Sequence, residues 1–246
     1  MSDQAPAVSI VIPAKNEAVR LPPSIRKIRS TFPNEPWEFI IVVELSTDGT
    51  AEAVREAVGV DPRFDVVCNP VARGKGYAVK TGMLRAKGDL VFFMDADLSV
   101  PLNYIPIFLN HSQEADVLIG SRRHPESIIQ VHQSAPREFS GRIFNFALRL
   151  LGITRLADTQ CGFKAFHRNA AQEIFSRLQQ DGFGFDVEAI LVAQTLGFRL
   201  LELPVEWADV KGSKVSPLNG LAALRDAVLA AWRVRREYSG YAKSRS

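Results

Sequence analysis

Short apolar runs alternate with longer amphipathic segments over the first hundred residues of the chain. Four runs, rich in β-branched and aromatic residues, each end at a polar or proline-containing stretch: Val8 to Ile12, Phe39 to Val43, Phe64 to Val67 and Leu90 to Met94. Continuous apolar runs of this length are typical of strands that are covered on both faces. The segments between them, near 17–31, 50–58 and 75–86, have helical spacing. The alternation predicts an α/β fold whose mostly parallel sheet is flanked by helices.

The second half of the chain continues with elements of the same two kinds. Strands are predicted at Asp116 to Ile119, Gly162 to His167 and Arg199 to Trp207. Helices are predicted at 136–151, 170–178, 187–196 and about 217–238. The first of these has its apolar residues at Phe139, Ile143, Phe146, Ala147 and Leu150. Because no Pro/Gly/Ser-rich linker separates the halves, we expect one compact domain.

Composition narrows the class of protein. The chain has 246 residues, 46% hydrophobic and 23% charged, which excludes a disordered chain and a disulfide-stabilised miniprotein. Its two cysteines, Cys68 and Cys161, suit free thiols in a reducing cytoplasm. The net charge of +3 is mild, and we expect no nucleic-acid partner. We expect neither a signal peptide nor a membrane span, since no apolar stretch of about 18 residues occurs.

Polar loops follow each of the four apolar runs. In parallel α/β sheets, ligands bind beyond the carboxyl ends of the strands, so these loops are the candidate site. They are Pro13 to Glu17, Glu44 to Thr50, Asn69 to Gly76 and Asp95 to Asp97.

Two of these loops carry groups suited to phosphate chemistry. Asp95 and Asp97 directly follow the most hydrophobic run, and such a pair can share Mg²⁺ or Mn²⁺ against the phosphates of a nucleotide. The alternative is a solvated turn. The basic, glycine-rich stretch Arg73 to Gly76 can bring backbone N–H groups and Lys75 close to phosphate, or simply begin a helix. It lacks the spacing of a P-loop.

Other charged residues stand where elements begin or end. Arg122 and Arg137 suit a phosphate or diphosphate, although surface arginines are common. Asp186 and Glu188 stabilise the dipole of a predicted helix, and one of them could instead act as a base. Lys214 precedes the last helix and is either a lid cation over a diphosphate or a solvated linker residue.

The last helix has an apolar face with basic residues around it. Arginines flank or interrupt that face, and a basic amphipathic helix with a tryptophan can lie in an anionic membrane interface. The alternative is packing against the core or against a second copy, which leaves self-association open. The apolar face comprises Leu218, Leu221, Leu224, Val228, Leu229 and Trp232.

Taken in order, these motifs resemble the inverting family 2 glycosyltransferases, and within them the dolichyl-phosphate (polyprenyl-phosphate) glucosyl- and mannosyltransferases. Seven segments in family order, spanning residues 8 to about 216, make this resemblance specific. They are Val8 to Glu17, Arg73 to Gly76, Met94 to Asp97, Gly120 to Arg122, Asp158 to Lys164, Phe185 to Glu188 and Gly212 to Val215.

The resemblance implies a GT-A (Rossmann-like) domain over residues 1–216, with a nucleotide-binding half near 1–124 and an acceptor half near 125–216. Residues 217–246 would form the basic helix and tail. The implied donor is a nucleotide sugar, UDP-glucose or GDP-mannose, and the implied acceptor is a polyprenyl phosphate. The protein would then act in the cytoplasm, peripherally on the membrane face.

The resemblance also implies roles for individual residues. Asp95 and Asp97 would hold Mg²⁺ or Mn²⁺, and Arg122 and Arg137 would hold the lipid phosphate. The nucleotide sugar would be bound by the metal ligand Asp95 and by Pro13, Ala14, Glu17, Glu44, Lys75 and Lys214. At Glu44 and Leu45 the chain departs from the family, which usually carries two aspartates there.

The chemistry expected of the site depends on the acceptor. A lipid phosphate is already anionic, so no strong general base is needed: Arg122 would position it, and the metal at Asp97 would stabilise the leaving diphosphate. A hydroxyl acceptor on a sugar, glycerate or polysaccharide needs a base, for which Asp186 is the candidate. A third interpretation is a non-catalytic protein that binds a nucleotide sugar, motivated by the altered Glu44–Leu45 loop.

Overall fold

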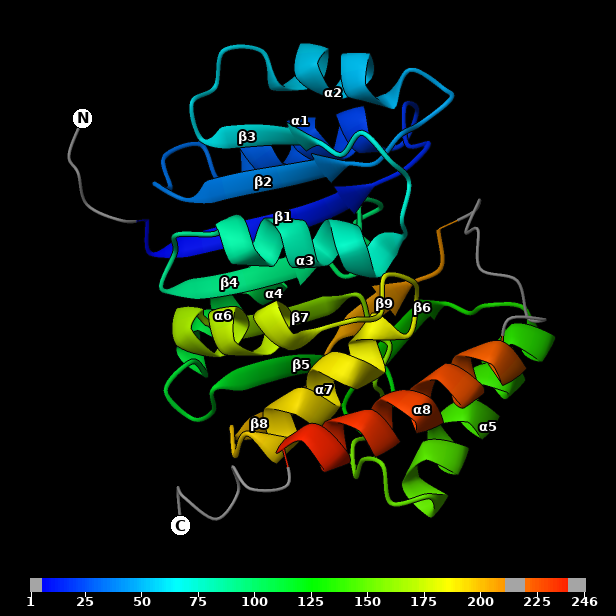
Figure 1. Ribbon diagram of the computed structural model, residues 1–246. Helices are drawn as coiled ribbons and strands as arrows, with labels where there is room; N and C mark the ends of the chain where they lie inside the picture. Colours follow the sequence, from blue (N-terminus) through cyan, green and yellow to red (C-terminus); the bar gives the residue numbers. More distant parts are fainter. Residues whose placement is uncertain (1–5, 211–219, 239–246) are drawn as a thin grey trace.

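The computed structural model describes residues 6–210 and 220–238 of the chain. A seven-stranded sheet with the order β3-β2-β1-β4-β7-β5-β8 forms its centre (Figure 1). All neighbouring strands are parallel except β7, which runs antiparallel to both β4 and β5. The strands are β1 (Val8–Ala14), β2 (Glu38–Val43), β3 (Phe64–Cys68), β4 (Leu90–Met94), β5 (Val117–Ser121), β7 (Phe163–His167) and β8 (Leu200–Pro204). The predicted α/β fold with a mostly parallel sheet is therefore confirmed.

Helices cover both faces of this sheet. Core residues of α3, α5, α6, α7 and α8 pack on one face, and those of α1, α2 and α4 pack on the other. The helices are α1 (Leu21–Thr31), α2 (Thr50–Val58), α3 (Lys75–Arg85), α4 (Tyr104–Asn110), α5 (Ala135–Leu150), α6 (Arg168–Arg177), α7 (Phe185–Thr195) and α8 (Gly220–Tyr238).

The strands read as unbroken apolar runs because both sides of the sheet are buried. Val11 points into one core, whereas its neighbours Ile10 and Ile12 point into the other, and all three are inaccessible to solvent. Successive side chains of a strand alternate between faces, so a sheet with helices on both sides needs apolar residues at every position.

Two predicted boundaries were wrong. Helix α1 begins at Leu21 rather than near residue 17, because Pro22 and Pro23 have no N–H to donate to the carbonyls of a preceding turn. The strand predicted over Arg199 to Trp207 is two strands, β8 and β9 (Glu206–Ala208), which belong to different sheets.

The sequence patterns missed two short elements. Strand β6 (Ile128–Val131) pairs with β9 in a separate two-stranded sheet. Helix α4, only seven residues long, joins β4 to β5 through the core of one face. Elements this short contain too few residues for a hydrophobic period to be recognised.

Helix α8 packs on the core mainly through small side chains, with the larger Leu224 partly buried against the same core. Ala227, Ala230, Ala231 and Val234 are buried, whereas Val228, Leu229 and Trp232 are exposed. The predicted start of this helix at 217, the proposed boundary at 216 and the tail beyond 238 lie outside the described residues. Within the described ranges, no helix combines the length and the hydropathy needed to cross a bilayer.

Candidate active site

One large cavity lies at the carboxyl edge of the sheet, where the four predicted loops meet. Its volume is about 1150 Å³. Its wall is formed by the end of β1, the loops that follow β2, β4 and β5, helices α3, α5 and α7, and one residue each of β6 and β9. The edge rule for parallel sheets thus located the cavity correctly. The lining includes these predicted site residues: Pro13, Ala14, Glu17, Glu44, Lys75, Asp95, Asp97, Arg122 and Asp186.

Two predicted residues cannot be placed in the cavity. Arg137 belongs to the first turn of α5, but its side chain is outside the described part of the chain. Lys214 lies in the stretch 211–219, also outside it. Their assigned roles stay predictions.

The loops after β1 and β2 are tied together by side-chain hydrogen bonds. Asn16, which has a left-handed φ of 54°, receives the Thr47 N–H on its side-chain oxygen at 2.9 Å. The Glu17 N–H donates to Thr50 Oγ1 at 2.8 Å, and the Glu17 carboxylate pairs with both Arg20 Nε and Nη2. These bonds hold Glu17 and Arg20 in fixed positions on the cavity wall. The sequence reasoning did not find Arg20.

Glu44 organises the glycine-rich turn rather than presenting a free carboxylate. Its side chain is buried, and its Oε1 accepts the N–H groups of Gly74 at 2.9 Å and Arg73 at 3.1 Å. A carboxylate that accepts backbone N–H groups is well compensated for its burial. The longer glutamate therefore fixes the loop that carries Lys75, while the neighbouring Leu45 is exposed.

Lys75 begins helix α3 and reaches the first aspartate of the pair. Its Nζ lies 2.6 Å from Asp95 Oδ1. Burial by itself would lower the pKa of Lys75, but the carboxylates of Asp95 and Asp186 outweigh burial and raise it. Lys75 is therefore a protonated cation at neutral pH beside the aspartate pair.

Asp95 occupies its place because residue 162 is a glycine. The Asp95 N–H donates to the Gly162 carbonyl at 3.1 Å, which holds the loop after β4 against the start of β7. A Cβ on Gly162 would lie 1.9 Å from Asp95 Oδ2. Any side chain at 162 would therefore displace the Asp95 carboxylate.

Asp97, the second acid of the pair, is fixed by hydrogen bonds from Ser99. Its Oδ1 accepts the Ser99 hydroxyl at 2.7 Å and the Ser99 N–H at 3.1 Å. Burial, and then the charge of Asp95, raise the pKa of Asp97. Two nearby carboxylates repel each other, and a cation that both of them contact stabilises their negative charges.

Asp95 and Asp97 fit a divalent metal whose remaining ligands come from a bound substrate. They do not fit a metal held by protein side chains alone. No cluster of three or more His, Cys, Asp or Glu side chains suited to a metal occurs among the described residues. Asp95 and Asp97 are hard oxygen donors, and Mg²⁺ characteristically takes one or two carboxylates together with phosphate oxygens and water. The pair would hold such an ion only with a phosphate ligand beside it.

Arg122 is held by a buried carboxylate. Its Nε and Nη2 donate to the two oxygens of Asp158 at 2.7 and 2.9 Å, and Asp158 is fully buried. Burial alone would raise the pKa of Asp158, but the Arg122 guanidinium and backbone N–H groups lower it well below its usual range. Arg122 is thus fixed at the cavity wall by two of the five N–H donors of its guanidinium.

A second buried ion pair lies under the cavity. Lys164 Nζ donates to Asp186 Oδ1 at 2.6 Å and to the Cys161 carbonyl at 2.8 Å. Burial raises the pKa of Asp186, and the charges of Lys164 and Lys75 oppose this rise. Sequence reasoning included Lys164 in a matching segment but assigned it no role.

Basic and aromatic side chains of α5 line the same cavity. They include Arg142, Phe146 and Arg149, joined by Arg123 from the loop after β5. Burial lowers the pKa of Arg123, and the nearby Arg122 and Arg142 cations lower it further. The cavity therefore combines an acidic pair with a group of cations suited to an anionic ligand.

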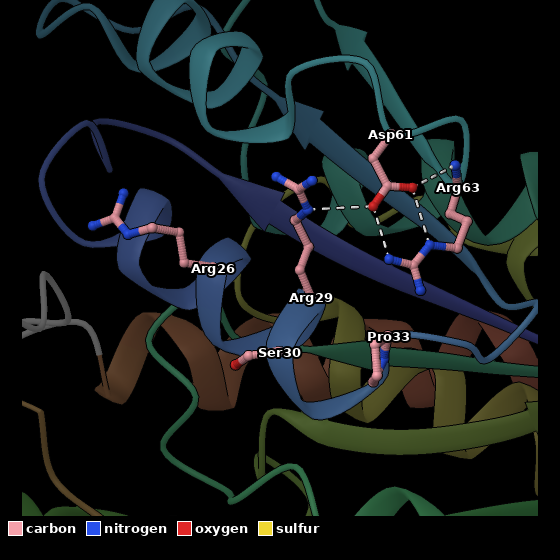
Figure 2. A pocket seen from close by; sticks show the side chains of 6 residues that line it. All are labelled: Arg26, Arg29, Ser30, Pro33, Asp61 and Arg63. Atoms are coloured by element: carbon pink, nitrogen blue, oxygen red, sulfur yellow. Dashed lines mark hydrogen bonds and ion pairs between the residues drawn. The ribbon is translucent and has the colours of Figure 1, made fainter.

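A smaller recess lies away from these loops (Figure 2). Its central acid, Asp61, pairs with Arg63 Nη2 at 2.7 Å and with Arg29 Nε at 3.3 Å. Hydrogen bonds from Arg63 hold the pKa of Asp61 below its usual range. We attribute this recess to a structural ion pair. Its lining residues are Arg26, Arg29, Ser30, Pro33, Asp61 and Arg63.

Comparison with known proteins identifies the class to which this fold and cavity belong. The family described as "Glycosyl transferase family 2" matches residues 9–175. The chain therefore belongs to glycosyl transferase family 2 and is a glycosyltransferase of the hexosyltransferase kind.

Relatives narrow the position of the chain within the family. It is 32% identical over 221 residues to a dolichyl-phosphate beta-glucosyltransferase of Trichomonas vaginalis, covering 84% of this chain and 65% of that protein. It is 32% identical to the dolichyl-phosphate beta-glucosyltransferase of Drosophila melanogaster, covering 92% and 77%. The human enzyme of the same name is 30% identical, covering 85% and 70%.

Solved structures confirm the GT-A fold. Glucosyl-3-phosphoglycerate synthase from Mycobacterium tuberculosis, in complex with Mn²⁺, UDP and glucosyl-3-phosphoglycerate, superposes with a TM-score of 0.66. That match covers 93% of this chain and 80% of the other at 19% identity. The same enzyme with Mg²⁺ and UDP also gives a TM-score of 0.66 at 20% identity.

Proposed function

We propose that this glycosyltransferase moves a hexose, with inversion, from UDP-glucose or GDP-mannose to a polyprenyl or dolichyl phosphate. The names of the relatives at about 30% identity support this acceptor. The observation that carries the proposal is the composition of one cavity, in which Asp95 and Asp97 share the wall with Arg123, Arg142 and Arg149. An acidic pair suits a metal-bound diphosphate, and a cluster of arginines suits a phosphate acceptor.

The donor would lie against Asp95, Asp97 and Lys75. A Mg²⁺ or Mn²⁺ ion held by the two carboxylates would neutralise charge on the diphosphate. Lys75, whose pKa is raised, adds a fixed positive charge beside it. Glu17 and Glu44 would border the nucleoside through the loops that they hold in place.

In the proposed transfer, a phosphate oxygen of the acceptor attacks C1 of the sugar from the face opposite the diphosphate. The new C1–O bond forms as the bond from C1 to the diphosphate oxygen breaks, and the nucleoside diphosphate leaves with the electron pair. No proton has to move, because the acceptor is already an anion at neutral pH. The arginines of the cavity, with Arg137 from the first turn of α5, would position that anion.

A hydroxyl acceptor is the second candidate, and Asp186 favours it. This carboxyl lines the cavity, and burial raises its pKa, which makes its carboxylate a stronger base. In that reaction the hydroxyl proton would pass to Asp186 as the C1–O bond forms. The buried Lys164 holds Asp186 in one orientation.

A transfer assay with labelled UDP-glucose or GDP-mannose decides the identity of the acceptor. Each donor is assayed once with Mn²⁺ and once with a chelator. We expect label in polyprenyl phosphate, lost on chelation, and none in 3-phosphoglycerate or free sugar. Asp186→Asn, checked for folding by circular dichroism, should keep most lipid-phosphate transfer. Label only in a hydroxyl acceptor, together with loss of activity in Asp186→Asn, would favour the second candidate instead.

The nucleotide and the place of action are tested separately. A thermal-shift panel of UDP-glucose, GDP-mannose and UDP-GlcNAc should show one donor that raises the unfolding temperature more with Mn²⁺ than without it. Because the proposed acceptor is a lipid, we also propose that the protein works peripherally at the cytoplasmic face of a membrane. Recovery of the enzyme in the soluble fraction alone would contradict that location.

A further inference from the structure

Helix α5 has two apolar faces, of which only one packs on the core. Phe144 and Leu148 on its inner face are buried. The opposite face carries large apolar residues spaced by four, three and four positions, which places them in one line along the helix. This line, here the outer stripe of α5, consists of Phe139, Ile143, Phe146 and Leu150, with exposed fractions of 64%, 51%, 58% and 76%.

Basic residues accompany the outer stripe. Arg142 and Arg149 lie along the same side of α5, and the one acid of the helix, Glu138, pairs with Arg142 at 2.5 Å. Four large apolar side chains exposed in one line form a contiguous apolar patch, and such patches mark interaction sites. Together with the arginines, they have the composition of a helix that lies in an anionic interface.

The neighbouring helix α8 presents a similar surface. The two helices pack side by side (Figure 1), and Arg235 of α8 donates to the Gly152 carbonyl just beyond α5 at 2.5 Å. Leu229 and Trp232 of α8 are exposed, and the Arg236 guanidinium lies 5.3 Å from the Trp232 ring centre. Two adjacent helices thus expose apolar and basic side chains together.

The outer stripe is continuous with the active-site cavity and rigidly connected to it. Phe146 belongs both to the stripe and to the cavity wall. On the inner face of α5, the buried Asn145 accepts hydrogen bonds from the Thr159 hydroxyl at 3.0 Å and from its N–H at 3.2 Å. Thr159 follows Asp158, which holds Arg122. A surface bound to the outer stripe would therefore lie in a fixed position relative to the active site.

We propose that the outer stripe of α5 inserts into the interface of an anionic bilayer, with the exposed residues of α8 beside it, so that the lipid phosphate enters the cavity directly from the membrane. This inference rests on the proposed lipid-phosphate acceptor. A second copy is a weaker occupant, because a symmetric contact through this stripe would bring the arginines of both copies together.

The test is co-sedimentation of the full chain with vesicles of phosphatidylcholine, with and without phosphatidylglycerol. The double variant Phe139→Gln/Leu150→Gln changes two stripe residues that do not line the cavity. We expect its affinity for anionic vesicles to fall about tenfold or more, and wild-type binding to weaken as salt is raised. The matched control Val19→Gln/Val60→Gln, which changes two highly exposed valines elsewhere, should bind as the wild type does.

Transfer assays separate this inference from the proposed function. With a short prenyl phosphate dispersed in water, the stripe variant should match the wild type, whereas with long-chain lipid in vesicles it should be several-fold slower. Wild-type protein that transfers to no prenyl phosphate would refute the acceptor, while the vesicle measurement alone decides the surface. Unchanged vesicle binding by the stripe variant would refute the surface, and its conversion from dimer to monomer in light scattering would assign the stripe to a second copy.

Discussion

The ammonium group of Lys164 lies 2.6 Å from Asp186 Oδ1, and the two side chains keep exposed fractions of only 1% and 6%. Lys164 comes from β7, the antiparallel strand in the centre of the sheet, and Asp186 comes from the first turn of α7. The pair joins the sheet to a helix directly under the cavity. Its position explains how a carboxylate can be both buried and held in a fixed orientation toward the site.

Breaking this pair should destabilise the protein strongly. Lys164→Met leaves the Asp186 charge buried without its partner, and we expect the free energy of unfolding to fall by about 3–5 kcal/mol. Urea denaturation at pH 7 measures this loss. Because the double variant Lys164→Met/Asp186→Leu has no unpaired charge, it should recover a large part of the loss. A double variant whose loss equals the sum of the single losses would show that the two residues are not coupled.

Asp97→Asn should abolish most transfer while leaving the fold intact. The amide keeps the shape of the side chain but removes one of the two negative charges available to a metal. In other active sites, removing one group that stabilises the charge of the transition state lowers the rate by about 10²–10³-fold, and we expect a similar fall in the transfer rate here. Asp89→Asn, which alters an exposed ion pair with Arg168, is the control and should keep wild-type activity. Wild-type rates in Asp97→Asn would remove this residue from the mechanism.

Gly162→Ala should disable the site through steric displacement. The added Cβ would coincide with the present position of Asp95 Oδ2, so the carboxylate must move. We expect weaker Mn²⁺ binding in the presence of nucleotide, measured by electron paramagnetic resonance, together with reduced transfer. Gly182→Ala is the matched control, since a Cβ there meets no atom within 4 Å. Equal metal affinity in both variants would contradict the steric argument.

Asp158 should contribute a pH-dependent part of stability. Its pKa is lowered in the folded protein, so its contribution is complete above the unfolded value of about 3.9 and is lost as the pH falls below that value. Asp158→Asn leaves Arg122 without its carboxylate, and we expect a loss of about 3–5 kcal/mol at pH 7. In urea denaturation, the difference between wild type and variant should stay constant from pH 7 to 5 and shrink below about pH 4. A difference that grows as the pH falls would have the wrong sign.

The sequence predicted the elements that lie in local patterns. Buried strands such as β4 read as apolar runs, and the polar loops after them marked the carboxyl edge, including Asp95 and Asp97. It did not predict that β7 enters the sheet antiparallel between β4 and β5. Strand order depends on contacts between distant segments, which no local period records.

The same limit applies to the side-chain partners of the site. Asp158 and Lys164 stood in a recognisable segment, but their pairing with Arg122 and Asp186 follows only from the way β5, β7 and α7 meet. Arg20 had no pattern around it that distinguished it from a surface arginine. The period of α5 predicted a helix, yet its most regular apolar line faces outward.

The chain by itself determined the alternation of strands and helices, the acidic pair and the family, because backbone geometry imposes fixed periods and because chemistry at a strand end needs particular side chains. Tertiary structure alone decided which charges neutralise each other and which apolar faces stay exposed. The energy of an ion pair depends on the distance between its charges, and the energy of a buried apolar surface depends on the exclusion of solvent. Residues far apart along the chain come close together and lose contact with solvent only once the sheet and its helices have assembled.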